Sequence, residues 1–414
     1  MAGPLTDAVA ELRRWAASGA MALTGRRQGP PTASPGRPAS TVTDALRRIR
    51  AVHPAVPLPG VGLLGERAAA AGLRRDAPRS CGGVFRVLRT RDGHLGLSLP
   101  RDDDLAAVPA LVSAQVDDAW EAVAAWSAGT GTAEAVDRAR LLGLACAPVV
   151  STSPAQPLRP PAVVAPLGTR KLTDRPLVVD FTSLWAGPLC AHLLSLCGAE
   201  VVKVESVHRL DGGRHGSAAF YDLLHAGHRS VTVDFDSPAD MDRLRRLVHR
   251  ADLVLEASRA RALHRRGLVA ADVVAAGTSW LSVTAYGRDQ DLIGFGDDVA
   301  AGAGLLTADL FPCGDALADP LTGVTAAACA VEALAGPQAV LIDVSMHTVA
   351  ARAVVGGIAP HEVVRRDGAW WVDCDAGRFP VADPRLRPAS GVAAMPGAHN
   401  GGFRRDPAAA RRRR

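Results

Sequence analysis

The sequence predicts an α/β protein whose larger part contains a mostly parallel sheet, together with a smaller α+β part. Two observations lead to this prediction. After about residue 170, short apolar segments alternate with helical patterns, which is typical of βαβ units. Before residue 150, an alternating apolar and polar segment surrounds an Asp-Gly turn and is followed by helical patterns. With 414 residues, 48% of them hydrophobic, the chain is long enough for two or three cores.

Residues 1–150 are predicted to form one unit. The segment 84–100, VFRVLRTRDGHLGLSLP, alternates apolar and polar residues around Asp92-Gly93, which indicates a hairpin. Two amphipathic helices separated by SAGTGT are expected after it, and Thr132 is predicted to cap the second. Residues 151–170 are rich in proline and lack periodicity, so they are predicted to be a linker.

Residues 171–400 are predicted to form the larger part. Six strands are expected in it, at 177–181, 200–205, 230–235, 252–256, 280–286 and 340–344. A helix is expected at 237–250, because Ser237 is a good N-cap residue and Pro238 suits the first helical turn. The proline-punctuated stretch near the end is expected to be an extended return segment, followed by an Arg-rich tail at 401–414.

Composition excludes several classes of function. The net charge is only +5, and the 4% of aromatic residues are not interleaved with basic stretches, which disfavours nucleic-acid binding. Seven cysteines without a CxxC pair argue against a disulfide framework or a zinc site, so no metal is predicted. No apolar run reaches the roughly 18 residues that span a bilayer, and the N-terminus does not resemble a signal peptide. A cytoplasmic protein is therefore expected.

The turn Ala186-Gly187-Pro188 directly follows a predicted buried strand. In a parallel sheet, ligands bind beyond the carboxyl ends of the strands, where loops lead into helices. Glycine allows close backbone approach, and the N–H groups at a helix start favour anionic groups such as phosphate. The turn is neither a GxGxxG motif nor a Walker loop, and a tight turn without a ligand explains this stretch equally well.

An ordered set of motifs resembles the family III coenzyme A transferases. The motifs are VVDFTSLWAGPLCAHLLSLCGAEVVKVE, DGGR, HAGHRSVTVDF, RLVHRADLVLEASR and WLSVTAYGRD, and the resemblance covers roughly residues 175–345. The family includes formyl-, carnitine- and bile-acid-CoA transferases and the α-methylacyl-CoA racemases. The resemblance implies a Rossmann-like large domain, a small domain and a homodimer. It also implies acyl-CoA and a carboxylic acid as substrates, with no permanently bound cofactor.

The resemblance places the catalytic aspartate in GFGDDVAAGAGLL, residues 294–306. Asp297 matches the family's spacing best, and Asp298 takes its place if the alignment is one residue out. The implied chemistry is attack of the carboxylate on a CoA thioester, followed by an aspartyl-CoA intermediate. For this role the carboxyl group needs no raised pKa. Two aspartates that only cap a helix in a solvated turn are the alternative.

The resemblance also implies a set of CoA-binding residues. They are Trp185, Ala186, Gly187, Lys203, Arg214, Arg229 and Arg259. At the last of these places the family has Asn-Phe-Arg-Pro-Gly, whereas this chain has Ala-Ser-Arg-Ala-Arg. Only the arginine is retained, so packing of the adenine against phenylalanine is lost.

Residues 15–31 and 132–149 resemble later parts of the same family, including its small domain. The two partial copies complement each other, which suggests a truncated tandem or permuted arrangement. Two alternatives to a transferase remain open: a degenerate CoA-binding protein without catalysis, and a racemase. The racemases carry a histidine before the aspartate, where this chain has Gly296.

Overall fold

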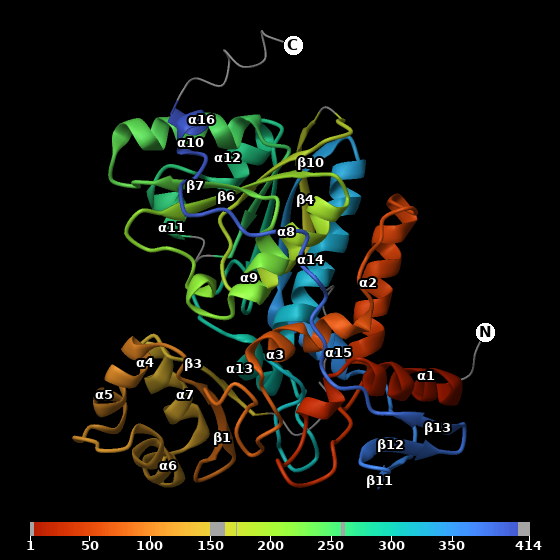
Figure 1. Ribbon diagram of the computed structural model, residues 1–414. Helices are drawn as coiled ribbons and strands as arrows, with labels where there is room; N and C mark the ends of the chain where they lie inside the picture. The colour runs from red at the N-terminus through yellow and green to blue at the C-terminus, as the bar shows by residue number, and fades with distance from the viewer. Residues whose placement is uncertain (1–3, 150–161, 171, 258–260, 405–414) are drawn as a thin grey trace.

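A seven-stranded sheet organises the larger part of the computed structural model, which describes residues 4–149, 162–170, 172–257 and 261–404 (Figure 1). Its strand order is β4-β10-β9-β8-β5-β6-β7. Neighbouring strands from β10 to β7 are parallel, and β4 joins β10 antiparallel. The strands are β4 (Ala162–Thr169), β5 (Leu177–Asp180), β6 (Glu200–Ser206), β7 (Arg229–Val233), β8 (Leu253–Glu256), β9 (Ser279–Thr284) and β10 (Gln338–Ser345). The predicted α/β class and all six predicted strands are confirmed.

The prediction of a linker over residues 151–170 is wrong for its second part. Ala162–Thr169 forms the edge strand β4, while 150–161 lie outside the described residues. Proline removes a backbone donor and is tolerated on edge strands and at bulges. The pairing of β4 with β10 has such an irregularity next to Pro166, between Ala339 and Val340. Pro166, one of the prolines on which the linker prediction rests, therefore lies on an edge strand where it costs little stability.

Helices cover both faces of the sheet. One face packs against α8 (Ala186–Leu196), α9 (Ala218–His225), α14 (Ala318–Ala335) and α15 (Met346–Val354). The other packs against α10 (Pro238–Arg250), α11 (Arg261–Arg265) and α12 (Ala270–Ala275). The predicted cap of α10 is confirmed, because the Ser237 hydroxyl accepts a hydrogen bond from the Asp240 N–H.

Residues 1–150 do not form one unit. Helices α1 (Pro4–Ala17), α2 (Pro38–Val52) and α3 (Glu66–Ala71), with the short η1 (Met21–Leu23) and η2 (Val61–Gly65), lie with the larger part. Trp15 and Leu46 are buried in its core, and α2 runs beside α14, where Arg48 pairs with Glu332 at 2.7 Å (Figure 1). The predicted boundary at 150 is therefore wrong for these helices.

A separate small α+β unit remains, at the lower left of Figure 1. Its strands are β1 (Phe85–Arg89), β2 (His94–Ser98) and β3 (Ala145–Pro148), and its helices are α4 (Asp102–Ala106), α5 (Val108–Val112), α6 (Ala119–Gly129) and α7 (Thr132–Leu141). The hairpin at Asp92-Gly93 is confirmed. The cap prediction is wrong: Gly131 is the N-cap, and Thr132 donates from both N and Oγ1 to Asp92 Oδ1 at 2.7 Å. The hairpin turn itself thus supplies the acceptor.

After β10 and α15 the chain forms a small antiparallel sheet of β11 (Glu362–Arg366), β12 (Ala369–Cys374) and β13 (Gly377–Pro380). It then returns in the predicted extended form and reaches β7, where the His399 N–H donates to Ser230 O at 2.9 Å. The last helix, α16 (Asn400–Arg404), lies beside β7. The outer strand β7 therefore meets a later segment of the same chain, residues 399–400, whereas β4 is the outer strand on the other side of the sheet. Among the described helices, none has both the length and the apolar character to cross a membrane.

Candidate active site

The parallel strands place their carboxyl ends at one edge of the sheet. The chain passes from β5 to β6 and β7 on one side, and then returns to place β8 on the other side of β5. Ligands of open α/β sheets bind at such a reversal of strand order. The predicted ligand turn leaves β5 at this point and leads into α8. Topology therefore puts Trp185, Ala186 and Gly187 where a ligand is expected.

The turn is tight and strained. Leu184 has a φ of 69°, in the left-handed region that bulky residues rarely adopt. Trp185 is the N-cap of α8 and provides no side-chain cap. Gly187 is buried, and a Cβ added there would collide with the Thr182 side chain. The glycine therefore lets α8 close on the strand end, and its close backbone approach is to Thr182.

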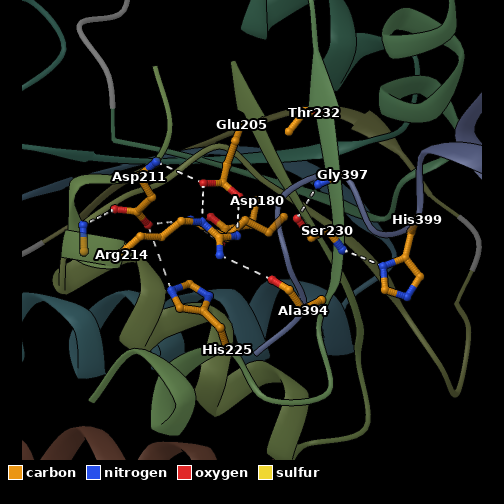
Figure 2. Close-up of polar contacts among 12 residues, drawn as sticks. Asp180, Glu205, Asp211, Arg214, His225, Ser230, Thr232, Ala394, Gly397 and His399 are labelled. Carbon is orange, nitrogen blue, oxygen red and sulfur yellow. Dashed lines mark hydrogen bonds and ion pairs between the residues drawn. The ribbon is translucent and has the colours of Figure 1, made fainter. Parts of the chain in front are cut away.

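A buried ion cluster contacts this turn, and Figure 2 shows its members Asp180, Glu205, Asp211 and Arg214. Lys203 is 2% exposed, and its Nζ lies 2.9 Å from Asp211 Oδ2 and donates to Thr182 O at 2.6 Å. Asp211 Oδ1 accepts from the N–H of the strained Leu184 at 2.9 Å. Burial alone would lower the pKa of Lys203, but Asp180 and Asp211 raise it. Lys203, predicted as a CoA ligand, thus binds the backbone and carboxylates of its own chain.

The other predicted cations lie in different places. Arg214 donates to Glu205 at 2.8 and 2.6 Å and to Ala394 O of the return segment at 3.3 Å (Figure 2). Arg229 begins β7, at the opposite edge of the sheet from the turn, and pairs with Glu200 at 2.9 Å. Arg259 lies outside the described residues. The structure therefore does not bring Arg229 together with the Trp185 turn.

Asp297 lies in the first turn of α13 (Gly296–Gly302) and is 8% exposed. Its Oδ1 accepts from the Ala316 N–H at 3.1 Å. Burial and the nearby Asp315 carboxylate raise the pKa of Asp297 to about 6, although Arg67 lowers it. A nucleophile needs no raised pKa, but the buried position of Asp297 raises it, so the carboxyl group is mostly ionised only above about pH 6.

Arg67 of α3 packs against Trp185 of the turn, and its charge acts on Asp297. Its Nε donates to Asp315 Oδ2 at 2.9 Å, and its Nη2 donates to Asp315 Oδ1. The guanidinium carbon lies 5.2 Å from the centre of the Trp185 ring. The Cys81 thiol also donates to Asp315, and burial, the largest cause, raises its pKa well above the usual value. Residues 66–81 thus complete the site that the larger part begins.

Asp298 faces a different part of the molecule. Its Oδ1 accepts from Ser98 Oγ at 2.8 Å and from the Phe295 N–H at 2.9 Å. It is fully buried, and burial raises its pKa to about 7. Asp298 therefore supports the start of α13 from the third helical residue, not from the N-cap, and it also ties α13 to β2.

Sequence reasoning missed three residues of this site: Arg67, Asp315 and Asp319. Burial raises the pKa of Asp319 to about 7. A Cβ on Gly296 would collide with Ala316 O and with the Asp319 carboxylate. This glycine therefore allows α13 to pack against the start of α14. No local pattern marks Arg67, which lies in the alanine-rich segment ERAAAA.

Two other features lie apart from this site. A cavity of about 350 Å³ lies on the α11 and α12 side of the sheet, lined by Trp280, Leu268, Arg288 and mainly apolar neighbours. Among the described residues, His208, Asp234 and Asp236 lie close enough to share a metal ion. Asp236 already pairs with Arg266.

The comparisons with known proteins cover half of the chain or less. Residues 174–367 match the sequence profile of CoA-transferase family III. The succinyl-CoA–D-citramalate CoA-transferase of Chloroflexus aurantiacus is 31% identical over 175 residues, which are 38% of this chain and 44% of the relative. The succinate–glutarate CoA-transferase of Agrobacterium fabrum is 28% identical over 171 residues, 36% of this chain and 43% of the relative. The chain thus spans less than half the length of either protein.

A crystal structure of the Mycobacterium tuberculosis protein Rv3272 aligns with 50% of this chain and 64% of its own, with 28% identity. The TM-score is 0.43, so the fold assignment rests on the strand order of this chain and not on the superposition. The profile match spans the parallel strands from β5 to β10, the Trp185 turn and Asp297. The resemblance to CoA-transferase family III that the sequence motifs predict is therefore confirmed over residues 174–367.

Proposed function

We propose that the protein transfers coenzyme A from an acyl-CoA to a carboxylic acid, with Asp297 as the nucleophile. The Asp297 carboxylate attacks the thioester carbonyl, forms a mixed anhydride and releases CoA as thiolate. The thiolate then attacks the aspartyl carbonyl of the anhydride, giving an aspartyl-CoA thioester and the donor's free carboxylate. The acceptor acid reverses these steps, and Asp297 is regenerated.

One observation carries this proposal: the Trp185 turn and Asp297 meet around a single cation. Arg67 lies against the Trp185 ring and beside the Asp297 and Asp315 carboxylates. The turn offers helix N–H groups suited to phosphate, and Asp297 offers a carboxylate that ionises near neutrality. The Asp297 carboxylate is the group that attack on a thioester requires, and the turn supplies donors for an anionic part of the substrate.

A racemase is less compatible with this geometry. It would need a second proton-transfer group facing Asp297, and in the racemases a histidine precedes the aspartate. Here Gly296 holds that position, and its Cβ direction is filled by Ala316 and Asp319. A histidine side chain could not be placed there without moving α14.

A non-catalytic CoA-binding protein is the second candidate function. The observation that favours it is the internal pairing of predicted phosphate ligands. Lys203 and Arg214 are both held by carboxylates of the same chain. In the catalytic proposal these two residues shape the turn, and Arg259 remains the predicted phosphate ligand.

We further propose that CoA is held only as a substrate and that the protein acts in the cytoplasm as a homodimer. Seven free cysteines fit a reducing compartment. The homodimer rests on the family resemblance. Residues 399–400 cover the β7 edge of the sheet, whereas β4 ends its other side.

Mass spectrometry of the intact protein after incubation with succinyl-CoA and hydroxylamine tests the function. Succinyl-CoA is chosen because the Chloroflexus aurantiacus relative is named for it. Hydroxylamine converts an activated Asp297 into a hydroxamate, which peptide mapping locates. Formyl-CoA is the second donor. Absence of a hydroxamate with both donors, together with measurable CoA binding, would favour the non-catalytic protein.

A further inference from the structure

The guanidinium of Arg67 has one edge that its own chain does not use. Nε and Nη2 are both directed to Asp315, and Nη1 donates to no residue within the described ranges. The Arg67 side chain is 35% exposed, whereas that of Asp315 is fully buried. Asp315 and the Trp185 ring therefore fix the group, and the Asp297 carboxylate is near enough to raise the pKa of Arg67.

We propose that this free edge of Arg67 binds the carboxylate of the acceptor acid. The inference rests on the proposed transfer reaction and names the substrate group that Arg67 recognises. Arginine suits a carboxylate because its planar donors match the two oxygens. Binding through one oxygen leaves the other free to attack the aspartyl-CoA carbonyl. That attack displaces CoA thiolate and forms an anhydride between Asp297 and the acid.

Charge then sets the order of binding. Arg67 and Asp315 neutralise each other, while free Asp297 adds a negative charge that repels a second carboxylate. The thioester form of Asp297 is uncharged, so the repulsion disappears once CoA is attached. The acid is therefore expected to bind the CoA-loaded protein more tightly than the free protein.

Two variants test the role of Arg67, and a third is the control. Arg67→Met removes the charge, and Arg67→Lys keeps the charge without the planar donors. The control, Arg79→Met, removes a nearby arginine in the sequence that pairs with Asp76. The reaction uses succinyl-CoA and ¹³C-labelled succinate. We expect Arg67→Met to raise the KM for succinate by about 10- to 100-fold, the range for a lost charge-assisted hydrogen bond. Hydroxamate formation from succinyl-CoA alone should fall less than the rate at limiting succinate. It is measured at pH 8, because loss of Arg67 raises the pKa of Asp297 and the carboxylate must stay ionised in both proteins. Arg67→Lys should recover part of the loss.

The contrary outcomes separate this inference from the proposed function. An unchanged KM for succinate in Arg67→Met, or a parallel loss of hydroxamate formation, would overturn the role of Arg67 in acid binding. If the wild type forms no hydroxamate, the proposed function fails, and succinate binding measured by calorimetry at pH 5, where most of Asp297 is uncharged, decides on Arg67 alone. Binding to the wild type that Arg67→Met loses and Arg79→Met keeps supports the acid site. Equal binding, or none, overturns it.

Discussion

Lys203 Nζ lies 2.9 Å from Asp211 Oδ2, and both side chains are buried beneath the turn that holds Trp185. Asp211 also accepts the N–H of Leu184, the residue with a φ of 69°. A strained backbone persists only where its surroundings hold it. The ion pair therefore holds the shape of the turn, even though the lysine does not reach its surface.

Replacing Lys203 with methionine should destabilise the protein by about 3–5 kcal/mol, because Asp180 and Asp211 would be left as buried, unpaired charges. The matched control is Arg229→Met, whose ion pair with Glu200 is partly exposed and should contribute at most about 1 kcal/mol. Urea unfolding of both variants measures the difference. If Lys203→Met unfolds like the wild type but no longer binds CoA, Lys203 is a direct CoA ligand after all.

The N-terminal helices belong to the core of the larger part, so residues 1–150 should not be stable alone. Trp15, Leu46 and Ile49 are fully or almost fully buried there and would be exposed in that fragment. We expect it to self-associate, whereas residues 80–149 alone should stay monomeric, because the small unit has its own core. Analytical ultracentrifugation of the two fragments checks this. A monomeric, well-folded fragment 1–150 would contradict the observed division.

The rate of hydroxamate formation should depend on pH through Asp297. The carboxyl must be ionised to attack, and its pKa lies at about 6, so the rate should rise about tenfold per pH unit below 6 and level off above 7. Asp315, Asp319, Cys81 and Arg67 are the ionisable groups coupled to it. Asp315→Asn removes a like charge, which should move the acidic limb to lower pH. If the acidic limb of the pH–rate profile does not move in Asp315→Asn, the titrating group is not Asp297.

Asp298 should make the protein less stable as the pH rises. Its pKa is about 7 in the folded protein and 3.8 as an ordinary value, so between these values the folded state holds a proton that the unfolded state has lost. The free energy of unfolding then falls with pH, by up to about 4 kcal/mol above pH 7. Asp298→Asn lacks this dependence. Its stability relative to the wild type should therefore increase from pH 4 to pH 8, and a constant difference would contradict the assignment.

Much of the fold followed from sequence because its strands are short, apolar and separated by helical patterns. The strand Leu177–Asp180 and the cap at Ser237 are local features, and local residues determine them. The edge strand Ala162–Thr169 was not predictable in this way, since it exists only by pairing with β10. The position of α2 was missed for the same reason, because its neighbour α14 lies more than 260 residues further along the chain.

The site residues likewise fall into those in local motifs and those placed by tertiary packing. The Trp185 turn and Asp297 lie in recognisable local motifs, whereas Arg67 reaches them only through the packing of α3. Lys203 and Arg214 were expected to bind a ligand because a sequence shows that a cation is present, not which carboxylate it meets. Burial of Asp211 and Glu205 beside them depends on the loop between β6 and α9, including η3 (Gly212–His215).

The roles of the two adjacent aspartates are separable by matched substitutions. Asp297→Asn keeps the size of the side chain but cannot form an anhydride, so hydroxamate formation should fall on the order of a thousandfold or more. Its melting temperature at pH 8 should be unchanged or higher, because a buried charge is removed. Asp298→Asn keeps an oxygen for the Ser98 hydroxyl and the Phe295 N–H, so it should retain most activity. Activity lost in Asp298→Asn and kept in Asp297→Asn would place the nucleophile one residue later, facing the small unit. Activity kept in both would exclude either carboxylate as the nucleophile.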